Sequence, residues 1–302
     1  MKVAALDLGS NTFLCLICEV KDHQIIKIIS DETEIVRLGQ GLNHSKVFHP
    51  DALVRAKVAL ERFKKTIEFF KPEKILAMAT SAARDAKNGN ELFNICNDLD
   101  IPLEIISGNQ EAHVTYIGSV SGLPLNSVKR LVVDIGGGST EFIAGYGQTV
   151  VNGLSQNIGC VRLTEKYFKE SIHTNEEISA CRDEIRQILF ETRKVLADSI
   201  DEIIAVAGTP TALVAAELNG FDSKKIDGFI FTSEKLEQWF DRLKYATLEE
   251  KIASGIPAGR ADVILVGIII LIETLHFFEL KQMIVSTRGV RYGIALQLEK
   301  NS

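Results

Sequence analysis

The sequence predicts an α/β protein that contains two copies of one unit. The first observation is a repeated pattern, VAALDLGSNT at residues 3–12 and LVVDIGGGST at residues 131–140, in which an apolar run ends in Asp and a turn of small residues. The second is that short apolar runs alternate with helical patterns after each of these turns. Such alternation is typical of domains in which helices cover a sheet.

The two turns have the composition of phosphate-binding loops. Asp7 corresponds to Asp134 and Gly9 to Gly136, and each turn ends in hydroxyl side chains. Glycine lets a backbone turn tightly and approach a ligand, so that successive N–H groups and hydroxyls can cradle a phosphate. For either turn alone, a glycine-rich hairpin that binds nothing is the alternative. Two such turns in one chain instead suggest two units that face each other across a cleft.

The first copy is expected to open with antiparallel strands and to continue with strands and helices in alternation. Pro50 begins a helix whose apolar residues recur every three or four positions, and Ser81 is a plausible N-cap for the short helix that contains Arg84. The expected strands are 3–8, 13–20, 24–30, 33–38, 74–80 and 103–107. The expected helices are 50–70, 91–99 and one that begins at Asn109 and carries Glu111.

The second copy repeats this order after a break at residues 121–124, which is the expected domain boundary. The expected strands are 131–134, 141–146, 148–155, 203–207 and 282–285. The expected helices are 161–168, 176–197, 211–218, 261–280 and 289–299. The segment 219–259 has no clear period and is expected to be helical with loops. The predicted domains are therefore residues 1–122 and 123–289.

Further motifs connect these elements to a known family. IIAVAGTPTAL at residues 203–213 adds a third glycine motif, and with the two hairpins it resembles the motifs of the actin and sugar kinase superfamily. TSAARDA, SGNQEAHVTYIG, GCVRLT, RADV and STRGVRYG occur in order along the chain. Together they are similar to the exopolyphosphatase and guanosine pentaphosphate phosphohydrolase (Ppx/GppA) family. The resemblance implies two actin-like (ribonuclease H-like) domains with an interdomain cleft, and a last helix, residues 290–302, that returns to the first domain.

The resemblance also implies the chemistry, which is release of terminal orthophosphate from polyphosphate or guanosine pentaphosphate. Such a reaction needs a positioned water, neutralisation of charge and in-line geometry. Glu111 matches the family's catalytic glutamate, and we expect a solvent-facing acid that activates the water. From local sequence alone, the alternative is an acid favoured at a helix N-terminus. Gln110 stands where many relatives have a second acid.

Residues around the turns are the expected ligands of the metal and the phosphates. Asp134 and Glu141 flank the second turn, where carboxylates could hold Mg²⁺ (or Mn²⁺) together with substrate phosphates and water. Arg84 matches a phosphate-contacting arginine of the family, and its planar fork suits phosphate oxygens. A capped turn and a solvated surface arginine are the alternatives. The other expected phosphate contacts are Ser10, Asn11, Thr12, Gly136, Gly137, Gly138, Ser139, Gly208 and Thr209.

The composition of the chain limits the kinds of binding partner and the cellular compartment that we expect for it. The net charge is −6 and no lysine or arginine run occurs, which argues against a nucleic-acid partner. Five scattered cysteines are typical of the reducing cytoplasm, and Cys15 and Cys18 are expected on opposite faces of one strand, as packing residues. The most apolar segment, residues 263–280, contains Glu273 and His276, so we expect a buried helix and no membrane span.

Two other functional classes remain open at this stage. One is a kinase of the same superfamily that transfers phosphate from ATP to a small acceptor. The other is a non-catalytic nucleotide-binding regulator that keeps the fold. Orthophosphate release without an acceptor distinguishes the hydrolase from both. The sequence fixes neither the preferred substrate nor the oligomeric state, for which a homodimer is one option.

Overall fold

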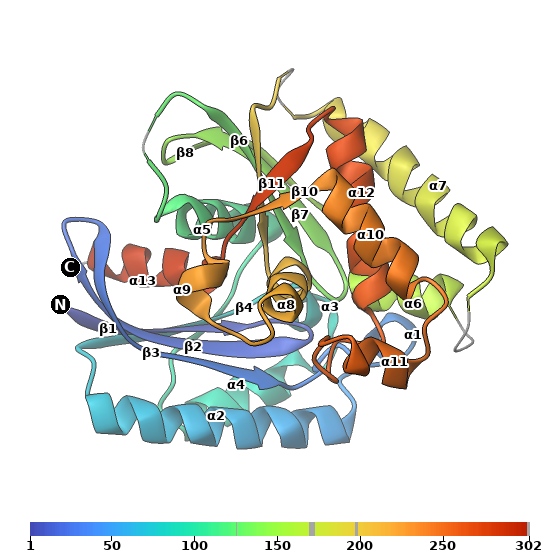
Figure 1. Ribbon diagram of the computed structural model, residues 1–302. Helices are drawn as coiled ribbons and strands as arrows, with labels where there is room; N and C mark the ends of the chain where they lie inside the picture. The colour runs from blue at the N-terminus through green and yellow to red at the C-terminus, as the bar shows by residue number, and fades with distance from the viewer. Residues whose placement is uncertain (125, 169–172, 197–198, 301–302) are drawn as a thin grey trace. The chain divides into compact units, whose positions relative to one another are not determined.

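The computed structural model describes residues 1–124, 126–168, 173–196 and 199–300. The chain forms two compact units (Figure 1). Unit 1 comprises Met1–Ser121 and Gly289–Ser302, and unit 2 comprises Gly122–Arg288. Each unit contains one sheet covered by helices, so the predicted α/β fold with two sheets is confirmed.

Unit 1 contains a five-stranded sheet in the order β3-β2-β1-β4-β5. Its strands are β1 (Lys2–Leu8), β2 (Thr12–Lys21), β3 (Gln24–Ile35), β4 (Lys74–Ala79) and β5 (Leu103–Ile105). The first three pair antiparallel, whereas β4 pairs parallel with both β1 and β5. The expectation of two strands at 24–30 and 33–38 is wrong, because β3 is continuous to Ile35. Two register shifts against β2 allow it to bend without ending.

Helices cover both faces of the unit 1 sheet. Residues of α2 (Pro50–Phe70), α3 (Ser81–Asp85) and α4 (Gly89–Asp98) pack in one core cluster, and residues of α5 (Gly108–Val120) and α13 (Val290–Lys300) pack in the other. Figure 1 shows α2 and α13 on opposite sides of the sheet. Cys15 belongs to the first cluster and Cys18 to the second, which confirms that they pack on opposite faces. A short α1 (Leu42–Ser45) precedes α2.

The helices α5 and α13 approach each other so closely that two positions require glycine. An ideal Cβ on Gly118 would lie 2.0 Å from the Gly289 carbonyl oxygen, and one on Gly293 would lie 2.0 Å from the Val114 carbonyl oxygen. Both neighbours are backbone atoms, which cannot rotate away. The C-terminal helix is therefore seated on unit 1 through direct backbone contact with α5.

Unit 2 contains a six-stranded sheet in the order β10-β11-β9-β6-β7-β8. Its strands are β6 (Lys129–Ile135), β7 (Thr140–Tyr146), β8 (Thr149–Gln156), β9 (Glu202–Val206), β10 (Phe229–Thr232) and β11 (Gln282–Val285). An antiparallel hairpin pair followed by parallel strands repeats the plan of unit 1. The edge strand β10 was not predicted, since its four residues lie in the segment without a clear period.

The helices of unit 2 are α6 (Cys160–Tyr167), α7 (Asn175–Arg193), α8 (Gly208–Glu217), α9 (Ser223–Ile226), α10 (Ser233–Leu243), α11 (Leu248–Ala253) and α12 (Ile264–Phe277). The helix predicted for 176–197 ends at Arg193, and its expected last residue, Ala197, lies outside the described residues. Helix α12 is buried from Ile264 to Leu275, as predicted. Within the described ranges, no helix is both long and apolar enough to cross a membrane.

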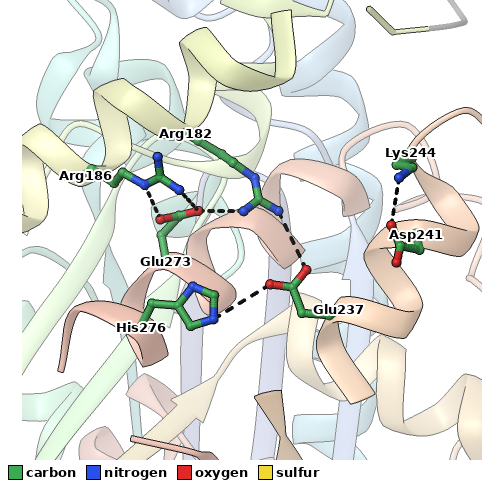
Figure 2. A network of polar contacts seen from close by, with 7 residues as sticks. All are labelled: Arg182, Arg186, Glu237, Asp241, Lys244, Glu273 and His276. Atoms are coloured by element: carbon green, nitrogen blue, oxygen red, sulfur yellow. Dashed lines mark hydrogen bonds and ion pairs between the residues drawn. The ribbon is translucent and has the colours of Figure 1, made fainter. Parts of the chain in front are cut away.

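Helix α12 carries one buried acid that attaches it to α7 (Figure 2). Glu273 is 2% exposed and accepts hydrogen bonds from Arg182 at 2.9 Å and from Arg186 at 2.6 and 3.2 Å. Arg182 also approaches Glu237 of α10, at 3.8 Å. A buried carboxylate without such partners is strongly destabilising. The two arginines therefore allow an acid inside an otherwise apolar helix.

The close α5–α13 contact can be tested by adding one methyl group. Gly118→Ala is expected to destabilise the protein by about 1–3 kcal/mol, the usual cost of forcing atoms into a packed contact. The measurement is the free energy of unfolding in urea. Gly289→Ala is the matched control, because a Cβ on Gly289 has no neighbour within 4 Å. Equal stability of the two variants would show that the helices separate without cost.

Candidate active site

The predicted site residues of unit 1 follow the carboxyl ends of its parallel strands. The loop of residues 9–12 follows β1, α3 with Arg84 follows β4, and α5 with Glu111 follows β5. Because the carboxyl ends of parallel strands lie along one edge of a sheet, the three segments are brought together, as at ligand sites of other α/β sheets. In unit 2 the loop of residues 136–139 and Gly208 follow β6 and β9 in the same way.

The first loop, residues 9–12, is closed by its own backbone. Gly9 N–H donates to the Thr12 carbonyl at 3.1 Å, and an ideal Cβ on Gly9 would lie 3.0 Å from that oxygen. The Ser10 carbonyl accepts from Gly39, and the Asn11 carbonyl accepts from the N–H groups of residues 36 and 37. Within the part of the chain that the structure describes, the Ser10 and Asn11 N–H groups have no protein acceptor.

The second loop, residues 136–139, has the same hydrogen bonds. Gly136 N–H donates to the Ser139 carbonyl at 2.9 Å, and an ideal Cβ on Gly136 would again lie 3.0 Å from the acceptor. The start of α6 occupies the glycine carbonyls: Cys160 N–H donates to Gly136, Val161 and Arg162 N–H to Gly137, and Arg162 Nε to Gly138 at 2.7 Å. The N–H groups of Gly137, Gly138 and Ser139 have no acceptor among the described residues.

The hydrogen bonds of these two loops are compatible with anion binding. In each loop a neighbouring segment donates hydrogen bonds to the carbonyls, whereas the N–H groups named above have no acceptor among the described residues. Consecutive N–H donors of this kind form concavities that bind phosphate. The predicted strand and hairpin loop is confirmed in both copies. That the two loops face one cleft stays a prediction.

Arg84 and Glu111 form a buried ion pair in unit 1. Arg84 Nη1 donates to Glu111 Oε2 at 2.6 Å and to the Ile106 carbonyl at 2.9 Å. Ser81, the first residue of α3, places its Oγ 3.0 Å from the Ser10 Oγ of the first loop. Ser81 is not the N-cap that was predicted. Thr80 holds that position, without a side-chain cap, and the Ser81 hydroxyl instead connects α3 to the loop.

The expectation that Glu111 faces solvent is wrong. Glu111 is 6% exposed, although Asn109 and Gln110, which precede it in the first turn of α5, are exposed. Burial raises the pKa of the Glu111 carboxyl, and the charge and hydrogen bond of Arg84 oppose that shift. A carboxyl held partly toward its neutral form by burial is typical of groups that transfer protons in active sites.

Gln110, which stands where many relatives have a second acid, has a structural role at the start of α5. The Gln110 side chain accepts from Ser107 N–H at 2.9 Å, while Ser107 Oγ accepts from Gln110 N–H at 3.3 Å. This capping box fixes the start of α5. Gln110 is therefore committed to the helix end, and Glu111 is the acid available for chemistry.

The predicted metal ligands belong to unit 2. Asp134 and Glu141 are directly opposite each other in the β6–β7 pair, so their side chains lie on the same face of the sheet. Ser155 on β8 donates its hydroxyl to Glu141 at 2.6 Å. No group of three or more metal-ligating side chains occurs among the described residues. Two carboxylates alone fit Mg²⁺, which usually keeps several waters and shares substrate phosphates.

Gly208 and Thr209 have local packing roles that the sequence did not reveal. The Arg260 guanidinium carbon lies where a Gly208 side chain would be, 1.7 Å from an ideal Cβ. Thr209 is 2% exposed, and its side chain packs against Gly267 of α12. Their contact with a ligand stays a prediction. We did not predict from the sequence that Arg260 lies beside the end of β9, although its RADV motif was a signal that the residue matters.

Comparison with known proteins agrees with this arrangement. The model of the Ppx/GppA phosphatase family matches residues 16–302. The chain belongs to the Ppx/GppA phosphatase family. It is 33% identical to exopolyphosphatase 2 of Mycobacterium tuberculosis over 314 residues, covering 98% of both chains. It is 30% identical to the guanosine-5′-triphosphate,3′-diphosphate pyrophosphatase of Pseudoalteromonas atlantica, covering 99% of this chain and 58% of that protein.

A solved structure of the Ppx/GppA family shows the same fold. The crystal structure of the Aquifex aeolicus family member superposes with a TM-score of 0.85 at 33% identity, covering 100% of this chain and 99% of that one. The family resemblance seen in the ordered motifs is thereby confirmed, as is the two-sheet fold class. As a member of the Ppx/GppA phosphatase family with an exopolyphosphatase relative, the chain is a hydrolase of the phosphatase class.

Burial of Glu111 predicts a pH-dependent gain in stability for Glu111→Gln. The pKa of Glu111 is raised above 4.5, so its contribution to stability is complete below about pH 4.5 and is lost as the pH rises through the folded value. The neutral variant avoids this loss. Relative to the wild type, the melting temperature of this variant should therefore be higher near pH 8 than near pH 4.

Thermal unfolding at both pH values provides the measurement. Glu61→Gln on the exposed side of α2 is the control, and it should show no such pH-dependent difference. A Glu111→Gln variant that is less stable at pH 8 than at pH 4, relative to the wild type, would contradict the inferred cost of burying this carboxylate.

Proposed function

We propose that this protein is a metal-dependent phosphohydrolase that releases terminal orthophosphate from inorganic polyphosphate, guanosine pentaphosphate or both. Membership of the Ppx/GppA phosphatase family supports the reaction class. The names of two relatives, an exopolyphosphatase and a guanosine-5′-triphosphate,3′-diphosphate pyrophosphatase, support the two substrates. Both substrates end in phosphoanhydride-linked phosphates, so one site can serve either.

One observation carries this proposal: the polar cluster at the carboxyl edge of the unit 1 sheet. It runs from Ser10 of the first loop through Ser81 to Arg84 and Glu111, with contacts of 3.0 Å and 2.6 Å. The cluster contains backbone N–H groups without a protein acceptor among the described residues and a buried carboxylate on a neighbouring element, which supports a phosphate site. A structural ion pair alone would not require a loop that directs its N–H groups to a ligand.

The proposed chemistry divides between the two units. The N–H groups of each loop would bind phosphate oxygens, and Asp134 and Glu141 would hold Mg²⁺ or Mn²⁺, which would supply positive charge to neutralise the phosphates. Glu111 accepts a proton from water. The resulting hydroxide attacks the terminal phosphorus, the bridging P–O bond breaks, and its electron pair leaves with the shortened chain. Enzymatic phosphoryl transfer depends mainly on such positioning and electrostatic stabilisation.

Orthophosphate release from several substrates tests the proposed function. The wild-type protein with Mg²⁺ should release orthophosphate from polyphosphates of several lengths or from guanosine pentaphosphate, without any phosphate acceptor. Glu111→Ala should reduce turnover about 10²–10⁴-fold, the usual contribution of a general base. Substrate binding should persist, since loop N–H groups and the metal provide the affinity.

The same assay distinguishes the two other classes. ATP turnover that needs an acceptor would identify a kinase, and ATP binding without turnover of any substrate would identify a regulator. Either result would overturn the hydrolase. Near-normal turnover by a folded Glu111→Ala variant would leave the hydrolase standing and remove Glu111 as its base.

The metal sites can be tested by titration. Activity should disappear in excess chelator and return with Mg²⁺ or Mn²⁺. Asp134→Asn should require a higher Mg²⁺ concentration for half-maximal activity, because one negative ligand is lost. Asp183→Asn, at an exposed position of α7, is the control and should leave the titration unchanged. Identical titrations for the two variants would exclude Asp134 as a ligand.

A further inference from the structure

The two oxygens of the Glu111 carboxylate have different surroundings. Oε2 accepts a hydrogen bond from Arg84 Nη1 at 2.6 Å. For Oε1, no donor is found among the described residues. The side chains of both residues are largely shielded, with 8% of Glu111 and 25% of Arg84 exposed. One oxygen is thus held by the protein while the other remains available to a water molecule.

Arg84 is itself anchored to the backbone just before α5. Its Nη1 donates to the Ile106 carbonyl at 2.9 Å, and Ile106 N–H donates to the Ala79 carbonyl at 3.1 Å, at the end of β4. The guanidinium is therefore anchored at the residue that follows β5, and the backbone of that residue is itself hydrogen-bonded to the end of β4. A planar guanidinium fixed at such a point allows its partner carboxylate little rotation.

We propose that Arg84 is a positioning residue, which holds Oε2 of Glu111 and thereby presents Oε1 to the attacking water. This inference rests on the proposed function, in which Glu111 is the base. It assigns to Arg84 a role different from the direct phosphate contact that the family resemblance implies. In the proton transfer, Oε1 gains the water proton while Oε2 keeps its bond to Arg84, and the hydroxide bonds to the terminal phosphorus.

The arginine also favours the ionised form of the base. Burial favours the protonated carboxyl, and Arg84 on α3 is the charged group that opposes this effect. Around Glu111 itself, the cap residues of α5 are the neutral Ser107 and Gln110, so they supply no second positive charge. Without Arg84, a larger fraction of Glu111 would carry a proton at neutral pH and could not accept one from water.

Positioning and direct phosphate contact predict different kinetics. Loss of a phosphate contact weakens substrate binding, so KM rises at every pH. Loss of a positioning partner reduces kcat. It also moves the acidic limb of the kcat–pH profile to higher pH, because a smaller fraction of the base is ionised. Lysine keeps the charge but lacks the planar fork. Arg84→Lys should therefore keep the acidic limb close to that of the wild type and still lower kcat.

The experiment compares pH profiles of kcat and KM for orthophosphate release by the wild type, Arg84→Gln, Arg84→Lys and Glu111→Gln. Arg62→Gln is the matched control, since Arg62 forms an exposed ion pair with Glu34 at 2.8 Å. Arg84→Gln should move the acidic limb upward by about one to three pH units, the usual effect of an opposite charge on a carboxyl. Arg62→Gln should resemble the wild type.

A titration of the Glu111 carboxyl carbon by NMR, in protein without substrate, gives a second readout. Its midpoint should move upward in Arg84→Gln. The double variant with Glu111→Gln should be no slower than Glu111→Gln alone, because a partner cannot position an absent base. If Arg84→Gln does not fold, Arg84→Lys decides the question: a lowered kcat with unchanged KM supports positioning, whereas a raised KM with unchanged kcat identifies a phosphate contact.

Two results would overturn the inference while leaving the hydrolase intact. One is an unchanged acidic limb and an unchanged carboxyl titration in Arg84→Gln, with KM raised at all pH values, which would identify a phosphate contact. The other is additive losses in the double variant. Failure of the proposed function has a different signature, in which the wild type releases no orthophosphate. Full turnover by Glu111→Gln would leave the hydrolase standing but would remove Glu111 as its base, and with it the premise of this inference.

Discussion

The candidate site depends on the hydrogen bonds that hold the carbonyls of the two glycine loops. A four-residue loop without these hydrogen bonds could present either its carbonyls or its N–H groups to a ligand, and only a loop that presents its N–H groups can bind phosphate. Residues 36–39 bind the carbonyls of the first loop, and the start of α6 binds those of the second. The glycine at the head of each loop is needed because a side chain there would press on the closing carbonyl.

Two buried glutamates, Glu273 and Glu111, both accept hydrogen bonds from arginine but differ in how many they accept. Glu273 accepts three hydrogen bonds from two arginines, and its position inside α12 gives it a structural role between helices. Glu111 has one arginine on one oxygen. Burial of a charge is costly unless its hydrogen bonds are satisfied. An incompletely satisfied carboxylate at the carboxyl edge of a sheet is therefore more consistent with proton transfer than with stabilisation.

The two copies of the unit have diverged in the residues beside their loops. In unit 2 Asp134 is opposite Glu141, whereas in unit 1 Asp7 is opposite Leu14. Unit 1 instead carries the Arg84–Glu111 pair. The shared backbone thus provides the same loop hydrogen bonds twice. The paired acids suited to a metal occur beside the second loop, and the buried acid suited to a base occurs on the helix after β5.

The sequence by itself determined the duplicated plan, both glycine hairpins, the buried α12 and the family, because these depend on local patterns and on motif order. Glu111 and Arg84 were found through their motifs. Tertiary structure decided that they touch, that Glu111 is buried, and that Ser81 contacts Ser10 rather than capping its helix. Those facts depend on how β1, β4 and β5 align side by side. Residues far apart in the chain meet there, and no local periodicity records which side chains lie opposite one another.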